Sequence, residues 1–263
     1  MVRVGDIGQT GVMPDDFRES DAFRCAHFER CELNDAVIRD CDVTGLQIVD
    51  SVVHDVIISG DLRNIVVNDV DVTAYGEGEF DRRYPERAHV RNAQTPDAYR
   101  ELWAIIAKLW AGTIERARLQ PEAALQEQVG GEWSFVETHR HLLFCSDAWV
   151  GNAVLEEQQP FHRIGYPATG YPPAKAAELG IELRASPTLD EVLAARKGRA
   201  ASVGRLIEEL TYEEFQRACA RKPSPEYPDQ RYTVDRCIRV VLREEVEHRR
   251  YAERDLTKLE ARI

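Results

Sequence analysis

A glutamate and a histidine four residues apart, Glu244 and His248, lie in the apolar stripe of a segment with helical periodicity. Residues four apart in a helix stand over one another on one face. The rest of the stripe runs through Val234, Cys237, Val241 and Ala252. Burying a carboxylate and an imidazole costs several kcal/mol unless a partner compensates. The compensation is either a hydrogen bond between the two side chains at a half-exposed position, or a divalent metal ion, for which both groups are good ligands.

A third candidate ligand follows the segment Gly131-Glu-Trp-Ser, because His141 comes eight residues after Trp133. This spacing resembles the DinB-like superfamily of four-helix-bundle metalloproteins, over about residues 95–260. There, one histidine on the second helix joins a His-x-x-x-His or Glu-x-x-x-His pair on the fourth. The order found here is similar to the N-terminal domain of mycothiol-dependent maleylpyruvate isomerase, most specifically over residues 244–256. The resemblance implies that His141, Glu244 and His248 bind one metal ion.

Periodicity alone offers a second histidine on the same helix, His139, on a different face from His141. Its neighbours at helical spacing are the more apolar ones, namely Phe135, Leu142, Leu143 and Val150. The Trp-Ser spacing favours His141, so His139 is the alternative ligand. Cys145, one turn after His141, is within reach of the site but has the size of a small core residue.

Two neutral imidazoles and one carboxylate leave a divalent ion with a charge of about +1 and at least one open coordination position. A water or thiol bound there loses its proton near neutral pH. Zinc is the expected ion, and the same ligands suit nickel or iron. The resemblance implies activation of mycothiol or another small thiol for transfer to, or isomerisation of, a small electrophile. The reacting group is the metal-bound water or thiol, and no side chain is assigned a catalytic role.

Further polar side chains are candidates for supporting roles near this site. Asp255, two turns beyond the Glu-His pair, would orient a metal ligand. Arg196 and Arg199 would bind a substrate carboxylate, or are simply exposed on their helix. The loop residues His162 and Tyr166 would approach the metal as a lid, or belong to an ordinary packed loop.

The elements that must position these residues are four helices with recognisable starts. Thr95-Pro96 begins a helix to about Arg118, and Ser134 begins a second to about Leu155. A capping box, Thr188-Leu-Asp-Glu191, begins the third, and the fourth runs from about Thr233 to Leu259. Four helices of this length predict a bundle over residues 95–263. The long loop over 158–187 is of a length usually found in functional or mobile segments.

The first part of the chain has a different texture, with a large apolar residue every five positions over residues 17–73. This period fits neither a helix nor a simple strand. It resembles the pentapeptide-repeat family, which implies a short right-handed quadrilateral β-helix over residues 1–74. Residues 75–94 lose the period and gain Gly, Pro and charge, which indicates a linker. The expected fold class is therefore α+β, a β-helix followed by a DinB-like four-helix bundle.

Bulk composition limits the partners. The 263 residues carry a net charge of −12, which argues against binding to nucleic acid. The absence of a long apolar run argues against a membrane span, and the absence of an apolar leader points to the cytoplasm. A small thiol and a small electrophile are the expected partners. The alternative is a non-catalytic metal-binding bundle whose β-helix mediates protein interaction or homodimer formation. A third interpretation, an acidic DNA-mimic regulator, is weakened by the few coils available.

Overall fold

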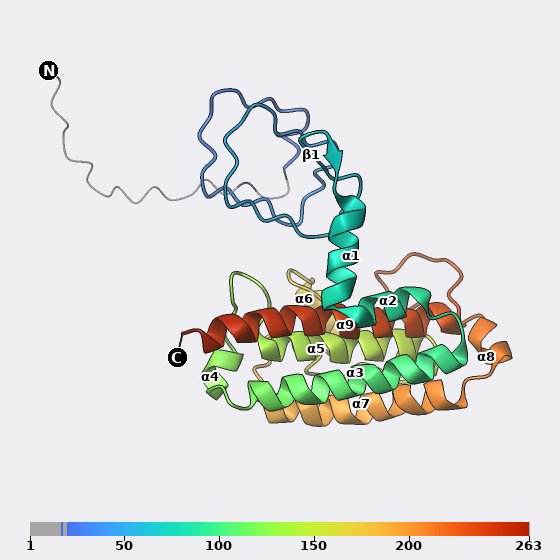
Figure 1. Cartoon of the computed structure of the whole chain (residues 1–263). Coiled ribbons are helices and arrows are strands. Elements are labelled where there is room, and N and C mark those ends of the chain that lie inside the picture. Colours follow the sequence, from blue (N-terminus) through green and yellow to red (C-terminus); the bar gives the residue numbers. More distant parts are fainter. Residues whose placement is uncertain (1–16, 18–19, 263) are drawn as a thin grey trace, which may run out of the picture. The chain divides into compact units, whose positions relative to one another are not determined.

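A computed structural model describes residue 17 and residues 20–262 (Figure 1). The chain divides into two compact units between Ser59 and Gly60. Every buried residue of the described chain lies in the second unit, from Glu86 onward. The hydrophobic core that positions the candidate site is therefore formed by the second unit alone.

The prediction of a quadrilateral β-helix is wrong. Residues 20–65 contain turns and bends without a strand, and part of the expected β-helix lies outside the described residues. The large apolar side chains of the five-residue pattern are exposed, with Phe23 at 44% and Phe28 at 55%. Left-handed backbone recurs at every fifth residue, at Cys25, Arg30, Asp35, Asp40, Gly45, Asp50 and Asp55. The period thus sets a repeating turn, without the strand ladders and buried interior of a β-helix. The DNA-mimic interpretation, which depended on that β-helix, loses its basis.

The second unit begins with a short antiparallel hairpin, β1 (Val66–Val67) and β2 (Val70–Asp71). Val67 pairs with Val70 across a two-residue turn, in which Asn68 and Asp69 both have positive φ. Two residues with positive φ are what the tightest hairpin turns require. These are the only strands in the described part of the chain, so the fold class is helical rather than α+β.

The expected linker over residues 75–94 is largely helical. It forms most of α1 (Thr73–Arg83) and all of α2 (Pro85–Asn92). Pro85 occupies the first turn of α2, where its fixed φ suits a helix start. Val90 is buried, and α2 packs along α9 (Val234–Glu260). The charged composition that indicated a linker belongs instead to a helix whose charges pair with α9.

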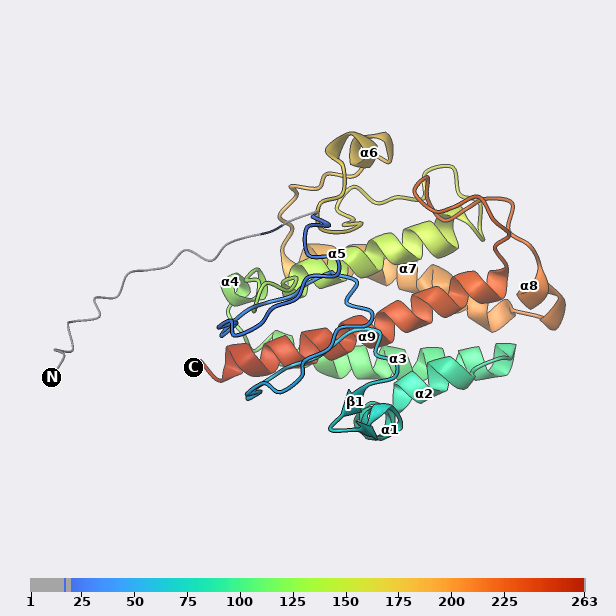
Figure 2. The ribbon, with the colours of Figure 1, turned by 90° about the horizontal axis from the view of Figure 1, so that it is seen from above.

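Four long helices form the bundle and lie side by side (Figures 1 and 2). They are α3 (Pro96–Ala117), α5 (Phe135–Ser146), α7 (Leu189–Glu209) and α9. Each begins after a Ser or Thr whose hydroxyl accepts a hydrogen bond from the backbone N–H three residues on, at Thr95, Ser134, Thr188 and Thr233. Both α3 and α5 pack against α7 and α9. The structure thus agrees with the helical bundle expected from the sequence.

The second long helix changes its winding where the sequence predicted a continuous helix to about Leu155. After Ser146 the chain continues as a π-helical turn, η1 (Asp147–Asn152). Wide turns of this kind are rare and frequently lie at functional sites. The change of winding comes two residues after Cys145.

The shorter helices α4 (Glu122–Leu125), α6 (Pro173–Glu178) and α8 (Tyr212–Gln216) belong to the connections. The loop over 158–187 contains α6 and is attached to the bundle through Arg140, a buried residue of α5. Its guanidinium donates to the carbonyl oxygens of Ile164 (2.8 Å), Leu183 (3.0 Å) and Glu182 (3.2 Å). Arg140 thereby fixes two parts of the loop to the helix that carries His141.

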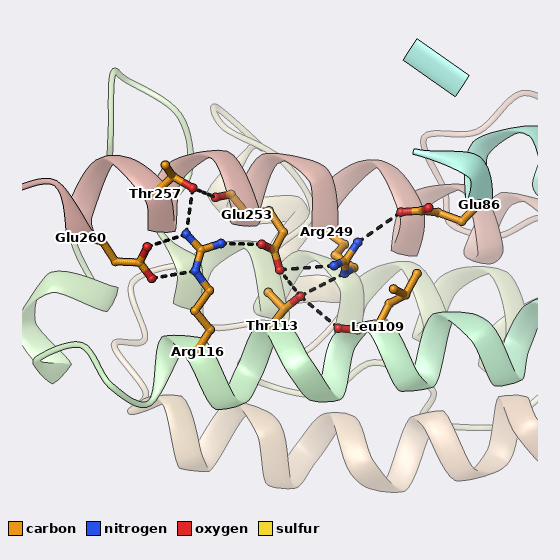
Figure 3. A network of polar contacts seen from close by, with 8 residues as sticks. All are labelled: Glu86, Leu109, Thr113, Arg116, Arg249, Glu253, Thr257 and Glu260. Atoms are coloured by element: carbon orange, nitrogen blue, oxygen red, sulfur yellow. Dashed lines mark hydrogen bonds and ion pairs between the residues drawn. The ribbon is translucent and has the colours of Figure 1, made fainter. Parts of the chain in front are cut away.

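A network of charged side chains fixes α9 against α2 and α3 (Figure 3). Arg116 of α3 pairs with Glu253 and Glu260 of α9. Arg249 of α9 reaches Glu86 of α2 at 3.2 Å, and donates to Thr113 of α3 at 3.0 Å. These contacts set the position of α9, the helix that presents Glu244 and His248.

No helix among residues 20–262 is long and apolar enough to cross a membrane.

Candidate metal centre

Donor atoms from two helices converge inside the bundle. His141 extends from α5, while Glu244 and His248 extend from α9. Glu244 Oε2 lies 3.7 Å from His141 Nε2 and 3.2 Å from His248 Nε2. The side chains of His141, Glu244 and His248 are only 12%, 23% and 15% exposed, respectively. The carboxylate is therefore placed between two largely buried imidazoles.

A fourth donor, Cys145, joins this group from α5. Its Sγ lies 3.2 Å from His141 Nε2, and the residue is buried. The donor atoms of His141, Cys145 and Glu244 all lie within 4.8 Å of one another. His248 meets the group through its contact with Glu244.

Three of the separations between donor atoms are close to those of a tetrahedral metal site. Zinc bonds of about 2.0–2.3 Å in tetrahedral geometry place neighbouring ligand atoms about 3.3–3.8 Å apart. The separations Cys145–His141 (3.2 Å), His141–Glu244 (3.7 Å) and Glu244–His248 (3.2 Å) are within a few tenths of an ångström of that range. The donor atoms of His141, Cys145 and Glu244 lie mutually close, and His248 would have to move toward them for all four residues to bind one ion.

His141 is oriented by a contact on the far side of its ring. Its Nδ1 lies 3.1 Å from the backbone carbonyl oxygen of Tyr166, which can only accept a hydrogen bond. In the neutral ring the proton is then on Nδ1, and the lone pair of Nε2 faces Cys145 and Glu244. This arrangement, in which a carbonyl fixes the tautomer of a ligating imidazole, is typical of metal sites in proteins.

Trp133 covers the two imidazoles. Its ring centroid is 4.6 Å from that of His141 and 5.5 Å from that of His248, with the latter pair nearly parallel. Its indole N–H donates to Thr169 in the long loop. Ser134, the next residue, caps α5 and so fixes where Trp133 leaves the helix. The Trp-Ser motif therefore has two structural roles, to cover the histidines and to set the start of the helix that carries His141.

Comparison with known proteins identifies the family of the helical bundle. The family profile described as the DinB superfamily matches residues 98–252, more than half of the chain. The chain belongs to the DinB superfamily. The match covers Trp133, His141, Glu244 and His248, and it does not extend to residues 17–73. No curated protein and no solved structure gave a significant match.

The electrostatics of this DinB site favour an ionised carboxylate. Burial acts to raise the pKa of Glu244, but its contacts with His141 and His248 outweigh burial and hold that pKa well below the ordinary value. Burial acts to lower the pKa of His141, but Cys145 and Glu244 raise it to about 10. Burial lowers the pKa of His248. In the ion-free protein a proton on His141 thus balances Glu244, and a metal ion would have to displace that proton.

The alternative ligand His139 lies in a separate polar cluster of the DinB bundle. It is fully buried, and Arg196 donates to its Nδ1. Arg196 also forms two hydrogen bonds, of 2.6 and 2.7 Å, with the buried carboxylate of Glu245. Burial lowers the pKa of His139, which keeps the ring neutral. The higher apolarity that favoured His139 on periodicity reflects its place in the core, away from Glu244.

Arg199 and His162 lie around the π turn. Arg199 pairs with Asp147 at 2.7 Å and with Glu157 at 2.8 Å. The backbone N–H of His162 donates to Asp147, while the residue itself is exposed. Burial outweighs the pairing with Arg199 and raises the pKa of Asp147 to about 7. Arg196 and Arg199 are thus neither exposed nor without carboxylate partners, because each already pairs within the protein.

The remaining two predicted residues have different outcomes. Tyr166 contributes its backbone carbonyl to His141, and its ring contacts Trp133 at 5.6 Å between centroids. Asp255 forms hydrogen bonds of 2.8 Å with Arg254, so its carboxylate is engaged outside the metal-binding group. The loop therefore reaches the site through a backbone atom, which side-chain patterns do not reveal.

Sequence reasoning gave too little weight to three polar residues at buried positions. Arg140, Asp147 and Glu245 are each at most 4% exposed. Arg140 donates hydrogen bonds to loop carbonyls, whereas Asp147 and Glu245 each form an ion pair with an arginine. The available signal was a charged residue inside an otherwise apolar helical face. The partners of Glu245 and Asp147 could not be identified from the sequence, because Arg196 and Arg199 lie more than 40 residues away from them.

Proposed function

We propose that the protein binds one divalent metal ion, zinc in the first place, through His141, Glu244 and His248. We further propose that it acts as a low-molecular-weight-thiol S-transferase or isomerase, of the mycothiol type, on a small electrophile. The observation that supports this most strongly is the convergence of two imidazoles and an ionised carboxylate from α5 and α9. Such a set leaves a divalent ion able to accept an exogenous ligand.

The chain's own residues have defined roles in this proposal. A bound divalent ion would lower the pKa of a coordinated thiol and so supply a thiolate nucleophile at neutral pH. Glu244 contributes the negative charge, and the Tyr166 carbonyl holds His141 in the tautomer that can bind. Trp133 excludes water from one side of both imidazoles.

A second candidate function is a metal-binding bundle without catalysis, and Cys145 favours it. A fourth protein ligand would close the coordination sphere, as in structural zinc sites. The two functions differ in one measurable respect, which is turnover of an electrophile at full metal loading.

Elemental analysis of untagged protein tests the proposal first. We expect about one equivalent of metal per chain, and loss of it in Glu244→Ala and His248→Ala. His89→Ala, which removes an exposed histidine outside the group, is the matched control and should retain the metal. The loaded protein is then assayed with a panel of small thiols against a generic electrophile. Metal without thiol-dependent turnover would favour the non-catalytic function, and absence of metal would overturn both.

A further inference from the structure

Cys145 has a geometry that a simple core residue does not need. It lies four residues after His141, so both side chains stand on one face of α5. Its Sγ is directed at His141 Nε2, the same atom that faces the Glu244 carboxylate. Since Nδ1 is already engaged by Tyr166, the thiol and the carboxylate share the one ring nitrogen available for a metal.

The other cysteines of the described chain differ in this respect. Cys25, Cys31 and Cys41 are exposed in the N-terminal unit. Cys219 and Cys237 lie near each other, with 3.8 Å between their sulfur atoms. Only Cys145 belongs to a group of histidine, cysteine and acidic donors close enough to hold an ion within residues 20–262.

We propose that Cys145 supplies a thiolate to the same metal ion, which completes a set of His141, Cys145, Glu244 and His248. As the metal–sulfur bond forms, the thiol releases its proton to solvent. This ligand set has two nitrogen atoms, one oxygen and one sulfur, and its softness selects zinc or cobalt over magnesium, calcium or manganese. The inference rests on the metal-binding part of the proposed function and is independent of catalysis.

The ligand set has a consequence for any exogenous thiol. Four protein ligands complete the coordination sphere of a tetrahedral zinc ion. An incoming thiol then has to enter as a fifth ligand or displace Cys145. Cys145 then determines how readily the metal accepts its substrate. Replacing it opens one coordination position without removing either histidine.

Cobalt substitution provides the test, because a thiolate bound to Co(II) gives a near-ultraviolet charge-transfer band that nitrogen and oxygen ligands do not give. The full chain with C25S/C31S/C41S is titrated with Co²⁺, so that the exposed thiols cannot contribute. We expect the charge-transfer band and the visible bands of four-coordinate cobalt to rise together. In Cys145→Ser the charge-transfer band should disappear and the cobalt affinity should fall at least about tenfold, in line with the sensitivity of metal sites to nearby substitutions.

Cys219→Ser is the matched control and should leave both sets of bands unchanged. Cys145→Ala, checked by circular dichroism, serves if the serine variant fails to fold. Visible cobalt bands without charge transfer in the parent protein would overturn the role of Cys145 and leave the three-ligand site standing. No cobalt binding would overturn the metal site itself. A charge-transfer band in a protein without thiol-dependent turnover would support Cys145 as a ligand and count against the transferase alone.

Discussion

The imidazole of His141 is engaged at both ring nitrogens, by the Tyr166 carbonyl at Nδ1 and by Cys145 and Glu244 at Nε2. A proton and a bound metal ion would therefore compete for one nitrogen atom. His139, two residues earlier, has no such choice, because Arg196 can only donate to it. The two largely buried histidines of one helix thus have different partners, a guanidinium for His139 and a thiol with a carboxylate for His141.

The competition predicts a pH dependence of stability in the ion-free protein. The pKa of His141 is raised from an ordinary value of 6.5 to about 10. Between these values the folded state binds more protons than the unfolded state, so stability falls as pH rises. This contribution is fully present below pH 6.5 and is lost as pH passes 10. Denaturant unfolding in the presence of a chelator, from pH 6 to pH 10, should show the decline, and His141→Gln should flatten it. An equal decline in that variant would exclude His141 as the source.

At the scale of the elements, the long loop and α5 are coupled through Arg140. Its three hydrogen bonds end on carbonyl oxygens of the loop that supplies Tyr166 to the site. Arg140→Met should destabilise the fold by about 2–3 kcal/mol, because charged hydrogen bonds to buried acceptors are lost. It should also lower metal affinity about tenfold, because the contact that orients His141 is weakened.

Arg163→Met is the matched control for this prediction. Arg163 belongs to the same loop and pairs with Glu182, but its side chain is 64% exposed. An exposed pair contributes about 0–1 kcal/mol, so stability and metal affinity should change little. Denaturant unfolding and competitive metal titration of both variants measure the difference. Equal effects in the two variants would mean that the loop is not held by Arg140.

A second coupling joins α5, α7 and α9 through Arg196. Arg196→Met leaves the Glu245 carboxylate, 2% exposed, without its charged partner, and should cost about 3–5 kcal/mol of unfolding free energy. Arg196→Met/Glu245→Leu should recover most of that loss, because no uncompensated charge remains. Arg205→Met, at an exposed position of α7, should change stability by no more than about 0.5 kcal/mol. Denaturant unfolding of the parent protein and these three variants measures the differences in unfolding free energy. A double variant as unstable as Arg196→Met would contradict this explanation.

The starts of the four long helices were predictable because each has a local signal. A hydroxyl cap with a glutamate three residues on, as in Ser134 and Glu137, depends on neighbouring residues alone. The contact between Glu244 and His248 was predictable for the same reason, since their spacing lies within one helix. The pairing of Arg196 with Glu245, and the approach of Tyr166 to His141, depend on how distant segments pack. The five-residue period was misleading because it reports where the backbone turns, and does not report whether strands pair between coils.

At the scale of the whole molecule, the two units differ in how they are stabilised. The described residues up to Ser59 are all exposed, whereas the bundle has a continuous buried core that includes all four long helices. Burial of apolar side chains is the dominant favourable contribution to folding. The stability of the metal-binding unit is therefore expected to depend on residues from Gly60 onward.

A chain starting at Gly60 tests this expectation. It retains α1, α2, the four long helices and every residue of the candidate metal centre. Its melting temperature should lie within about 2 °C of that of the full chain, since a change of 1 kcal/mol in a protein of this size moves the midpoint by about 2–4 °C. Its metal content and its cobalt spectrum should equal those of the full chain. Calorimetry and metal analysis of both proteins, purified side by side, make the comparison. A lower melting temperature with unchanged metal content would show that the N-terminal unit stabilises the bundle, and a loss of metal would show that the site needs residues before Gly60.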